Sequence, residues 1–144
     1  MKNLRREQLK RVHWWNAMFQ KRVLVVDDDA AVRQLFMTLL RRNGYEVDQA
    51  HDGREGLSLV RSSDYSAIIL DLMMPITSGF ELLDILQAEK PDALRHVIVT
   101  SGASRTELGK LDASRVFALI RKPFDIHELL RKVSECSSET ISVS

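Results

Sequence analysis

Residues 67–75 read Ala-Ile-Ile-Leu-Asp-Leu-Met-Met-Pro, an apolar run that ends in one carboxylate and is followed by a proline. Four consecutive apolar residues from Ala67 predict a strand buried on both faces, as in a parallel sheet covered by helices. Asp71 then stands at the carboxyl end of the strand, the edge where open α/β sheets bind ligands. Taken alone, Asp71 is better explained as a strand end that caps a turn.

A second strand pattern with an acidic end changes this interpretation. Residues 23–26 are consecutive aliphatic residues, and Asp27, Asp28 and Asp29 follow them directly. Neighbouring parallel strands bring their carboxyl ends to one edge of the sheet. The sequence therefore predicts a group of carboxylates around Asp71 at that edge.

Strand and helix patterns alternate along the rest of the chain. Further strands are expected over 45–50, 96–101 and 116–121. Helices are expected over five segments, namely 32–40, 54–62, 80–86, 104–111 and 126–133, and over 32–40 the apolar residues are spaced as on one helical face. Strand followed by helix, five times, predicts an α/β fold with a doubly wound five-stranded parallel sheet and helices on both faces. The strand order 2-1-3-4-5 is expected by precedent from flavodoxin-like proteins.

Composition sets the outer limits of the fold and its setting. The chain has 144 residues, of which 44% are hydrophobic and 28% charged, a size and balance that favour one globular domain with a substantial core. Cys136 is the single cysteine, so an intrachain disulfide is excluded and a reducing, cytoplasmic setting is expected. The sequence contains no apolar run as long as a membrane span.

An uneven charge distribution divides the chain. Residues 1–22 contain seven lysines and arginines and one glutamate, whereas residues 23–144 contain 14 basic and 19 acidic side chains. We expect a basic amphipathic extension over 1–20, a folded domain over 21–136 and a polar tail over 137–144.

The extension carries apolar side chains near helical spacing. They are Leu4, Leu9, Val12, Trp15 and Phe19, with basic residues mostly around the rest of the helix. Three interpretations remain open: packing on the chain's own domain or on a neighbouring copy, weak contact with a membrane surface, and contact with nucleic acid. The first is preferred, and no direct nucleic-acid binding is expected of the protein.

The predicted sheet edge has the composition of a phosphoryl-transfer site. Asp27, Asp28 and Asp71 repel one another unless a cation compensates them, and Mg²⁺ prefers such oxygen ligands. The ends of the fourth and fifth strands add Thr100 and Lys122, whose hydroxyl and ammonium groups suit phosphoryl oxygens. A carboxylate in this setting can act as the nucleophile that forms an aspartyl-phosphate.

Four segments, VLVVDDD at 23–29, IILDLMMP at 68–75, VIVTSGA at 97–103 and RKPF at 121–124, resemble the signature blocks of response-regulator receiver domains of two-component signalling. The resemblance spans about residues 21–134. It implies a role for each matching position: Asp71 is the phosphoacceptor, Asp28 a direct Mg²⁺ ligand, Asp27 a ligand directly or through water, Met73 a ligand through its backbone carbonyl, Thr100 the switch hydroxyl, and Lys122 the phosphoryl contact, with a cis bond before Pro123.

The resemblance also implies partners. A sensor histidine kinase or a histidine phosphotransfer protein would donate the phosphoryl group, and the protein would catalyse only its own phosphorylation and dephosphorylation rather than act as an enzyme. The sequence shows no effector domain after the last helix, so we expect a stand-alone receiver that signals by contact with an output protein the sequence does not name. A homodimer is compatible with this expectation.

One position departs from the family pattern. The family usually has an aromatic residue three positions before the lysine, where this chain has Leu119, and Phe117 lies two residues earlier. Strand alternation predicts that the two side chains share a face, with Phe117 further from the site. The departure keeps open a pseudo-receiver that binds a partner without phosphorylation.

A phosphatase with an aspartate nucleophile is a weaker alternative. The three consecutive aspartates after the first strand resemble the D-x-D start of the haloacid dehalogenase family, but Ala31 stands where that motif has Thr or Val.

Overall fold

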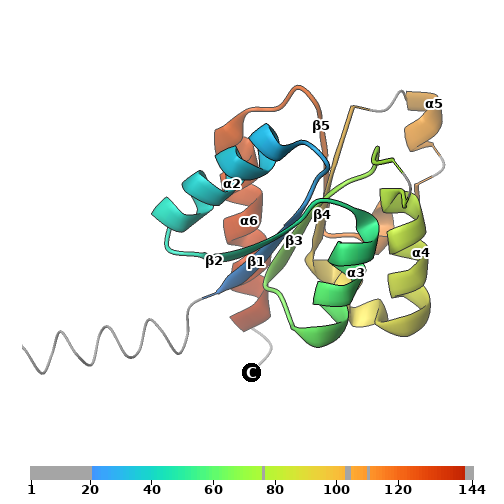
Figure 1. The fold of residues 1–144 in the computed structure, drawn as a ribbon, viewed down its shortest axis with the longest axis horizontal. Helices are drawn as coiled ribbons and strands as arrows, with labels where there is room; N and C mark the ends of the chain where they lie inside the picture. Colours follow the sequence, from blue (N-terminus) through green and yellow to red (C-terminus); the bar gives the residue numbers. More distant parts are fainter. Residues whose placement is uncertain (1–20, 76, 103–104, 110, 142–144) are drawn as a thin grey trace, which may run out of the picture.

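The computed structural model describes residues 21–141 apart from residues 76, 103, 104 and 110. Its centre is a five-stranded sheet with the order β2-β1-β3-β4-β5, in which all neighbouring strands run parallel (Figure 1). The strands are β1 (Arg22–Val26), β2 (Glu46–Ala50), β3 (Ala67–Asp71), β4 (Val97–Ser101) and β5 (Ala118–Arg121). The predicted fold class and strand order are confirmed.

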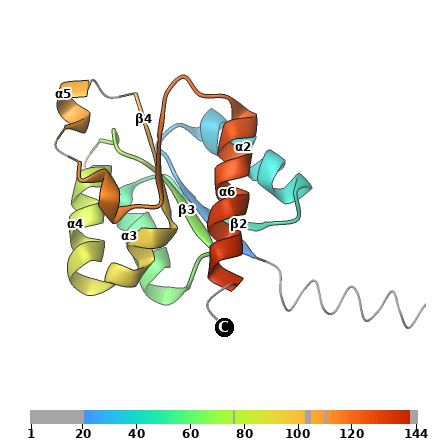
Figure 2. The same cartoon turned by 180° about the vertical axis from the view of Figure 1, so that it is seen from behind.

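Helices cover both faces of the sheet. They are α2 (Ala30–Arg42), α3 (Gly53–Ser62), α4 (Gly79–Glu89), α5 (Arg105–Leu108) and α6 (Ile126–Ile141), with the 3₁₀ helices η1 (Pro91–His96) and η2 (Ala113–Arg115). Helices α2 and α6 lie on one face and α3 and α4 on the other (Figures 1 and 2). Polar caps set several helix starts: Asp29 caps α2, Asp52 caps α3 and Ser78 caps α4.

The core consists of two apolar layers, one on each side of the sheet. Every residue of β3 and of β4 is buried, as expected for central strands of a parallel sheet. Alternate strand residues enter opposite layers: Leu70 packs toward α3 and α4, whereas Ile69 packs toward α2 and α6. The sheet is thereby fixed in register, and its carboxyl edge is positioned by packing on both sides.

The predicted shared face of Phe117 and Leu119 is wrong. Phe117 packs against the layer on the α2 and α6 side, whereas Leu119 packs against the layer on the α3 and α4 side. The reason is that β5 begins at Ala118 rather than at the expected Val116, so strand alternation does not extend back to Phe117. Phe117 therefore lies on the opposite side of the sheet from Leu119 and does not supply an aromatic side chain there.

Other boundaries also differ from the expected ones. Helix α6 continues to Ile141, because Cys136 and Ser137 are buried and the Ser137 hydroxyl donates to the Val133 carbonyl at 2.7 Å. Polar composition alone therefore placed the start of the tail too early. The predicted amphipathic helix of residues 1–20 lies outside the described residues. Over the described part of the chain, no helix combines the length and apolarity needed to cross a bilayer.

Candidate functional site

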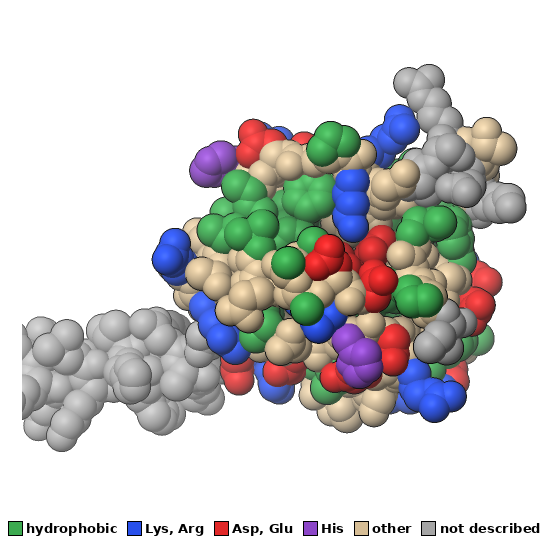
Figure 3. Space-filling view, turned by 45° about the horizontal axis from the view of Figure 1, so that its top comes forward, with side chains coloured by type: hydrophobic (Ala, Val, Ile, Leu, Met, Phe, Trp, Pro, Cys, Tyr) green, Lys and Arg blue, Asp and Glu red, His purple; other side chains and the backbone are tan. Residues whose placement is uncertain are grey.

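The acidic residues predicted from two strand ends meet at the carboxyl edge of the sheet. Because β1 and β3 are neighbours with Val26 opposite Leu70, Asp27 and Asp71 emerge side by side. Carboxylate oxygens of Asp27, Asp28 and Asp71 all lie within 4.8 Å of one another. Asp27 and Asp71 are only 2% and 4% exposed, whereas Asp28 is exposed. Acidic side chains with a basic side chain beside them mark this edge in Figure 3.

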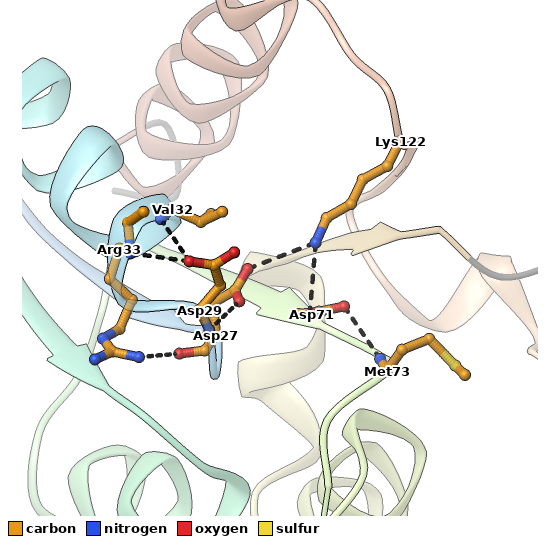
Figure 4. A network of polar contacts seen from close by, with 8 residues as sticks. Asp27, Asp29, Val32, Arg33, Asp71, Met73 and Lys122 are labelled. Carbon is orange, nitrogen blue, oxygen red and sulfur yellow. Dashed lines mark hydrogen bonds and ion pairs between the residues drawn. The ribbon is translucent and has the colours of Figure 1, made fainter.

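Lys122 reaches this acidic group from the end of β5. Its ammonium nitrogen lies 3.6 Å from Asp27 Oδ2 and 3.5 Å from Asp71 Oδ2 (Figure 4). The Lys122 backbone N–H donates to the Ser101 carbonyl at 2.8 Å, which ties the residue to the end of β4. The peptide bond between Lys122 and Pro123 is cis, as the resemblance implied. One cation therefore faces two buried carboxylates.

Backbone donors hold one oxygen of each buried carboxylate. The Asp29 N–H donates to Asp27 Oδ1 at 2.9 Å, and the Met73 N–H donates to Asp71 Oδ1 at 3.1 Å. The other oxygen of each residue, Oδ2, points toward Lys122 (Figure 4). In each case the following turn supplies the donor, because its backbone amide lies two residues after the acid.

Burial raises the pKa of Asp27, and the Asp29 N–H and the Lys122 ammonium only partly offset this, while Asp71 adds to it. Burial likewise raises the pKa of Asp71 against the Met73 N–H and Lys122, and the charge of Asp28 adds to it. The site is therefore short of positive charge when its carboxylates are ionised. Asp27 Oδ2 is also buried without a hydrogen bond from any described residue.

Thr100 supplies a hydroxyl beside the central carboxylate. It lies opposite Asp71 in the β3–β4 register and is fully buried. Within the described part of the chain its Oγ1 has no hydrogen-bond partner. A buried hydroxyl without a partner costs free energy, so a hydrogen bond to a group bound beside Asp71 would stabilise it.

Two residues that sequence reasoning missed support the site. Arg33 on α2 donates from Nη1 to the Asp27 carbonyl at 2.6 Å and from Nε to Gln49 at 3.2 Å, so it holds the ends of β1 and β2 together. At Gly79 a Cβ atom would lie 2.6 Å from the Asp71 carbonyl oxygen, which only glycine avoids. The sequence signals that would have identified them are an arginine four residues after a helix cap and a glycine at the first position of a helix.

A second group of potential metal ligands has a local explanation. His51, Asp52 and Glu55 lie at the start of α3. Asp52 Oδ1 caps the helix by accepting from the Glu55 N–H at 2.8 Å, and the His51 ring contacts both carboxylates. Helix capping and side-chain pairing account for this group.

Comparison with known proteins agrees with this arrangement of residues. The sequence model of the response regulator receiver domain family matches residues 23–134. Response regulator MprA of Mycolicibacterium vanbaalenii is 38% identical over 112 residues, which cover 78% of this chain and 48% of that protein. MprA of Mycobacterium tuberculosis strain H37Rv matches at the same identity and coverage. The chain thus spans about half the length of the curated relatives it matches.

Solved structures agree with the sequence comparison. The receiver domain of Francisella response regulator 1452 superposes with a TM-score of 0.75 at 33% identity, covering 84% of this chain and 99% of that one. Response regulator TrrA of Thermotoga maritima, solved in complex with Mg²⁺-BeF, gives 0.72 at 34% identity, covering 81% and 99%. A CheY-like receiver domain from Methanospirillum hungatei gives 0.78 at 28% identity, covering 87% and 99%.

Proposed function

Because the chain belongs to the response-regulator receiver domains, we propose that it accepts a phosphoryl group on Asp71 in a reaction that requires Mg²⁺. The observation that carries the proposal is the convergence of Lys122, Thr100 and the acidic group on one carboxylate. Asp71 Oδ1 is held by the Met73 N–H, which leaves Oδ2 as the nucleophilic atom.

The proposed step is a displacement at phosphorus. Asp71 Oδ2 forms a new P–O bond, and the bond between phosphorus and the donor's histidine nitrogen breaks, with its electron pair leaving on the imidazole. The Lys122 ammonium, already beside Oδ2, would neutralise one phosphoryl oxygen. The unpaired Thr100 hydroxyl would donate to another.

The acidic group fits a hard divalent cation. Three carboxylates within 4.8 Å, one of them with a buried oxygen that lacks a hydrogen bond, match the oxygen donors that Mg²⁺ takes. Asp27, Asp28 and Asp71, with the Met73 carbonyl, are the residues that would hold it. When bound, the ion supplies positive charge that stabilises the transferring phosphoryl oxygens. The structure of a Thermotoga relative with Mg²⁺-BeF supports this assignment.

The proposal also includes the proteins with which the chain exchanges the signal. We infer that the donor is a sensor histidine kinase or a histidine phosphotransfer protein, and that the phosphorylated domain signals by contact with an output protein. The names of the curated relatives support a response-regulator role. A pseudo-receiver that works without phosphorylation is the second candidate, favoured by the aliphatic Leu119 where the family usually has an aromatic side chain.

Intact-mass measurement after incubation with Mg²⁺ and acetyl phosphate tests the proposal. We expect the native chain to gain the mass of one phosphoryl group, and Asp71→Asn to gain none. Asp125→Asn is a matched control, because Asp125 is an exposed aspartate whose Oδ1 likewise accepts a backbone N–H two residues later, from His127 at 2.8 Å. A native chain that stays unmodified while Mg²⁺ binds would favour the pseudo-receiver.

A further inference from the structure

The half-buried side chain of Arg33 on α2 joins the end of β1 to the end of β2. Its Nη1 donates to the Asp27 carbonyl at 2.6 Å, and its Nε donates to Gln49 Oε1 at 3.2 Å. In Figure 4 the guanidinium meets Asp27 on the side away from Lys122. The two bonds use two nitrogens of one planar group, an arrangement that a lysine with its single nitrogen cannot reproduce.

The backbone of Asp27 is held on both sides. Its N–H donates to the Ala50 carbonyl at 3.1 Å, and its Oδ1 accepts from the Asp29 N–H at 2.9 Å. Its carbonyl accepts from Arg33, the one partner of these three that is a side chain. A substitution at position 33 therefore releases the Asp27 carbonyl and leaves the other two bonds in place.

The carbonyl that Arg33 holds belongs to the peptide that joins Asp27 to Asp28. A peptide unit is planar, so fixing its oxygen also fixes the direction in which the chain continues to the Asp28 Cα. The Asp28 carboxylate is exposed, and none of the described residues donates a hydrogen bond to it or forms an ion pair with it. The position of this carboxylate therefore depends on the backbone that carries it.

We propose that Arg33 is a positioning residue for Mg²⁺: by holding this peptide, it sets how the carboxylates of Asp27 and Asp28 lie relative to each other. The inference rests on the proposed function, because Mg²⁺ is the cation proposed for the acidic group. Mg²⁺ demands nearly octahedral geometry, so a pair of carboxylates that is free to shift binds it less tightly. Groups that orient metal ligands typically contribute about ten- to a hundred-fold to metal affinity.

The direction of the effect separates this role from two simpler ones. Arg33 is a cation close to a site for a cation, so if its charge dominated, removing it would strengthen Mg²⁺ binding. If Arg33 only stabilised the fold, removing it would leave the Mg²⁺ affinity of the folded chain unchanged. If Arg33 positions the carboxylates, removing it weakens Mg²⁺ binding.

Calorimetric titration with Mg²⁺, without a phosphodonor, measures this difference. We expect Arg33→Met to bind Mg²⁺ about ten-fold more weakly than the native chain, and Arg33→Lys, which can still donate to the Asp27 carbonyl, to recover part of the loss. Arg61→Met is the matched control and should bind Mg²⁺ as the native chain does. Arg61, in the last turn of α3, also donates through Nε and one Nη nitrogen, to Glu89 at 2.8 and 2.6 Å.

A second variant keeps the test valid if Arg33→Met does not fold. Gln49→Met removes only the other acceptor of the guanidinium, and Gln49 is exposed, so this variant should fold and lose less Mg²⁺ affinity than Arg33→Met. Unchanged or tighter Mg²⁺ binding in both variants would overturn the positioning role. A native chain that binds no Mg²⁺ would overturn the proposed function as well, whereas equal binding by the native and variant chains would overturn this inference alone.

The rate of phosphorylation provides a further readout. With acetyl phosphate as donor, the Mg²⁺ concentration that gives half of the maximal rate should rise about ten-fold in Arg33→Met. The maximal rate at saturating Mg²⁺ should stay close to that of the native chain, because the substitution leaves Asp71, Thr100 and Lys122 in place. A lower maximal rate with an unchanged Mg²⁺ requirement would contradict the proposal.

Discussion

The Lys122 ammonium lies 3.5 Å from the Asp71 carboxylate although β4 separates the strands from which the two residues come. We expect Lys122→Met to lower the free energy of unfolding of the Mg²⁺-free domain by about 1–3 kcal/mol, because two buried carboxylates lose their cation. Urea unfolding measures this change. Lys132→Met, which breaks a surface pair with Glu135 at 3.5 Å, should cost only about 0–1 kcal/mol. If the two variants lose equal free energy of unfolding, Lys122 contributes no more to stability than a surface ion pair does.

The raised pKa of Asp27 gives a prediction for stability and pH. Because the folded state holds the proton more tightly than the unfolded chain, this residue's contribution to stability is present in acid and is lost as the pH rises through the raised pKa. Asp27→Asn should therefore exceed the native chain in stability at mildly alkaline pH, with a smaller advantage at mildly acidic pH. Urea unfolding with EDTA at both pH values measures the difference. If the stability advantage of Asp27→Asn over the native chain instead grows as the pH falls, the prediction is contradicted.

The two consecutive aspartates after β1 should contribute unequally to Mg²⁺ binding. Asp28→Ala should remove a direct ligand, whereas Asp27, whose Oδ1 is held by the Asp29 N–H, would bind the ion directly or through water. We expect calorimetric titration to show about a ten-fold loss of affinity for Asp27→Ala and a larger loss for Asp28→Ala. Asp29→Ser keeps the α2 cap and should bind normally. Unchanged affinity in both alanine variants would mean that the acidic group only ends a strand.

The lifetime of the phosphoryl group should depend on positions 73 and 102, because neither Met73 nor Gly102 has a side-chain group that can position water. Met73 is half-exposed next to the site, and Gly102 has space for a side chain, because an added Cβ would meet no atom within 4 Å. Met73→Asn and Gly102→Glu should accelerate loss of the phosphoryl group, since each can hydrogen-bond an attacking water. Decay followed by intact mass measures this. Leu35→Asn is the control, since Leu35 is similarly exposed on α2. Rapid decay of the native chain, unchanged in either variant, would exclude the prediction.

The response to phosphorylation should depend on Thr100 more than on residue 119. The Thr100 hydroxyl has no hydrogen-bond partner among the described residues and would gain one from a phosphoryl oxygen. Leu119, by contrast, is an aliphatic side chain packed on the α3 and α4 side. We expect Thr100→Ala to reduce the NMR chemical-shift response over residues 100–121, and Leu119→Tyr to preserve or enlarge it. If the chemical-shift response is intact in Thr100→Ala and abolished in Leu119→Tyr, the output surface lies elsewhere.

Much of the sheet and of the site could be predicted because few physical rules determine them. Buried strands require continuous apolar runs, and parallel packing brings the strand ends to one edge, so Asp27 and Asp71 had to meet there. Such features depend on residues close in sequence or on the topology as a whole.

The remaining features depend on packing between distant segments. Where β5 begins is decided by its pairing with β4, which no local pattern reveals, so Phe117 was assigned to the wrong side. The length of α6 follows from burial of Cys136, whose thiol donates to the Ser66 carbonyl at 3.4 Å. The contact of Arg33 with the end of β1 likewise needs the helix to be placed first.

The close approach at Gly79 has a mechanical consequence. Its N–H donates to the Leu72 carbonyl at 3.0 Å, and its missing side chain lets the first turn of α4 rest directly on the backbone of Asp71 and Leu72. The start of α4 and the backbone at the end of β3 are therefore in direct contact at Gly79 and cannot move independently there. A displacement of the backbone after Asp71, the proposed phosphoacceptor, must also displace the start of α4, so this helix would move together with the residue proposed to carry the phosphoryl group.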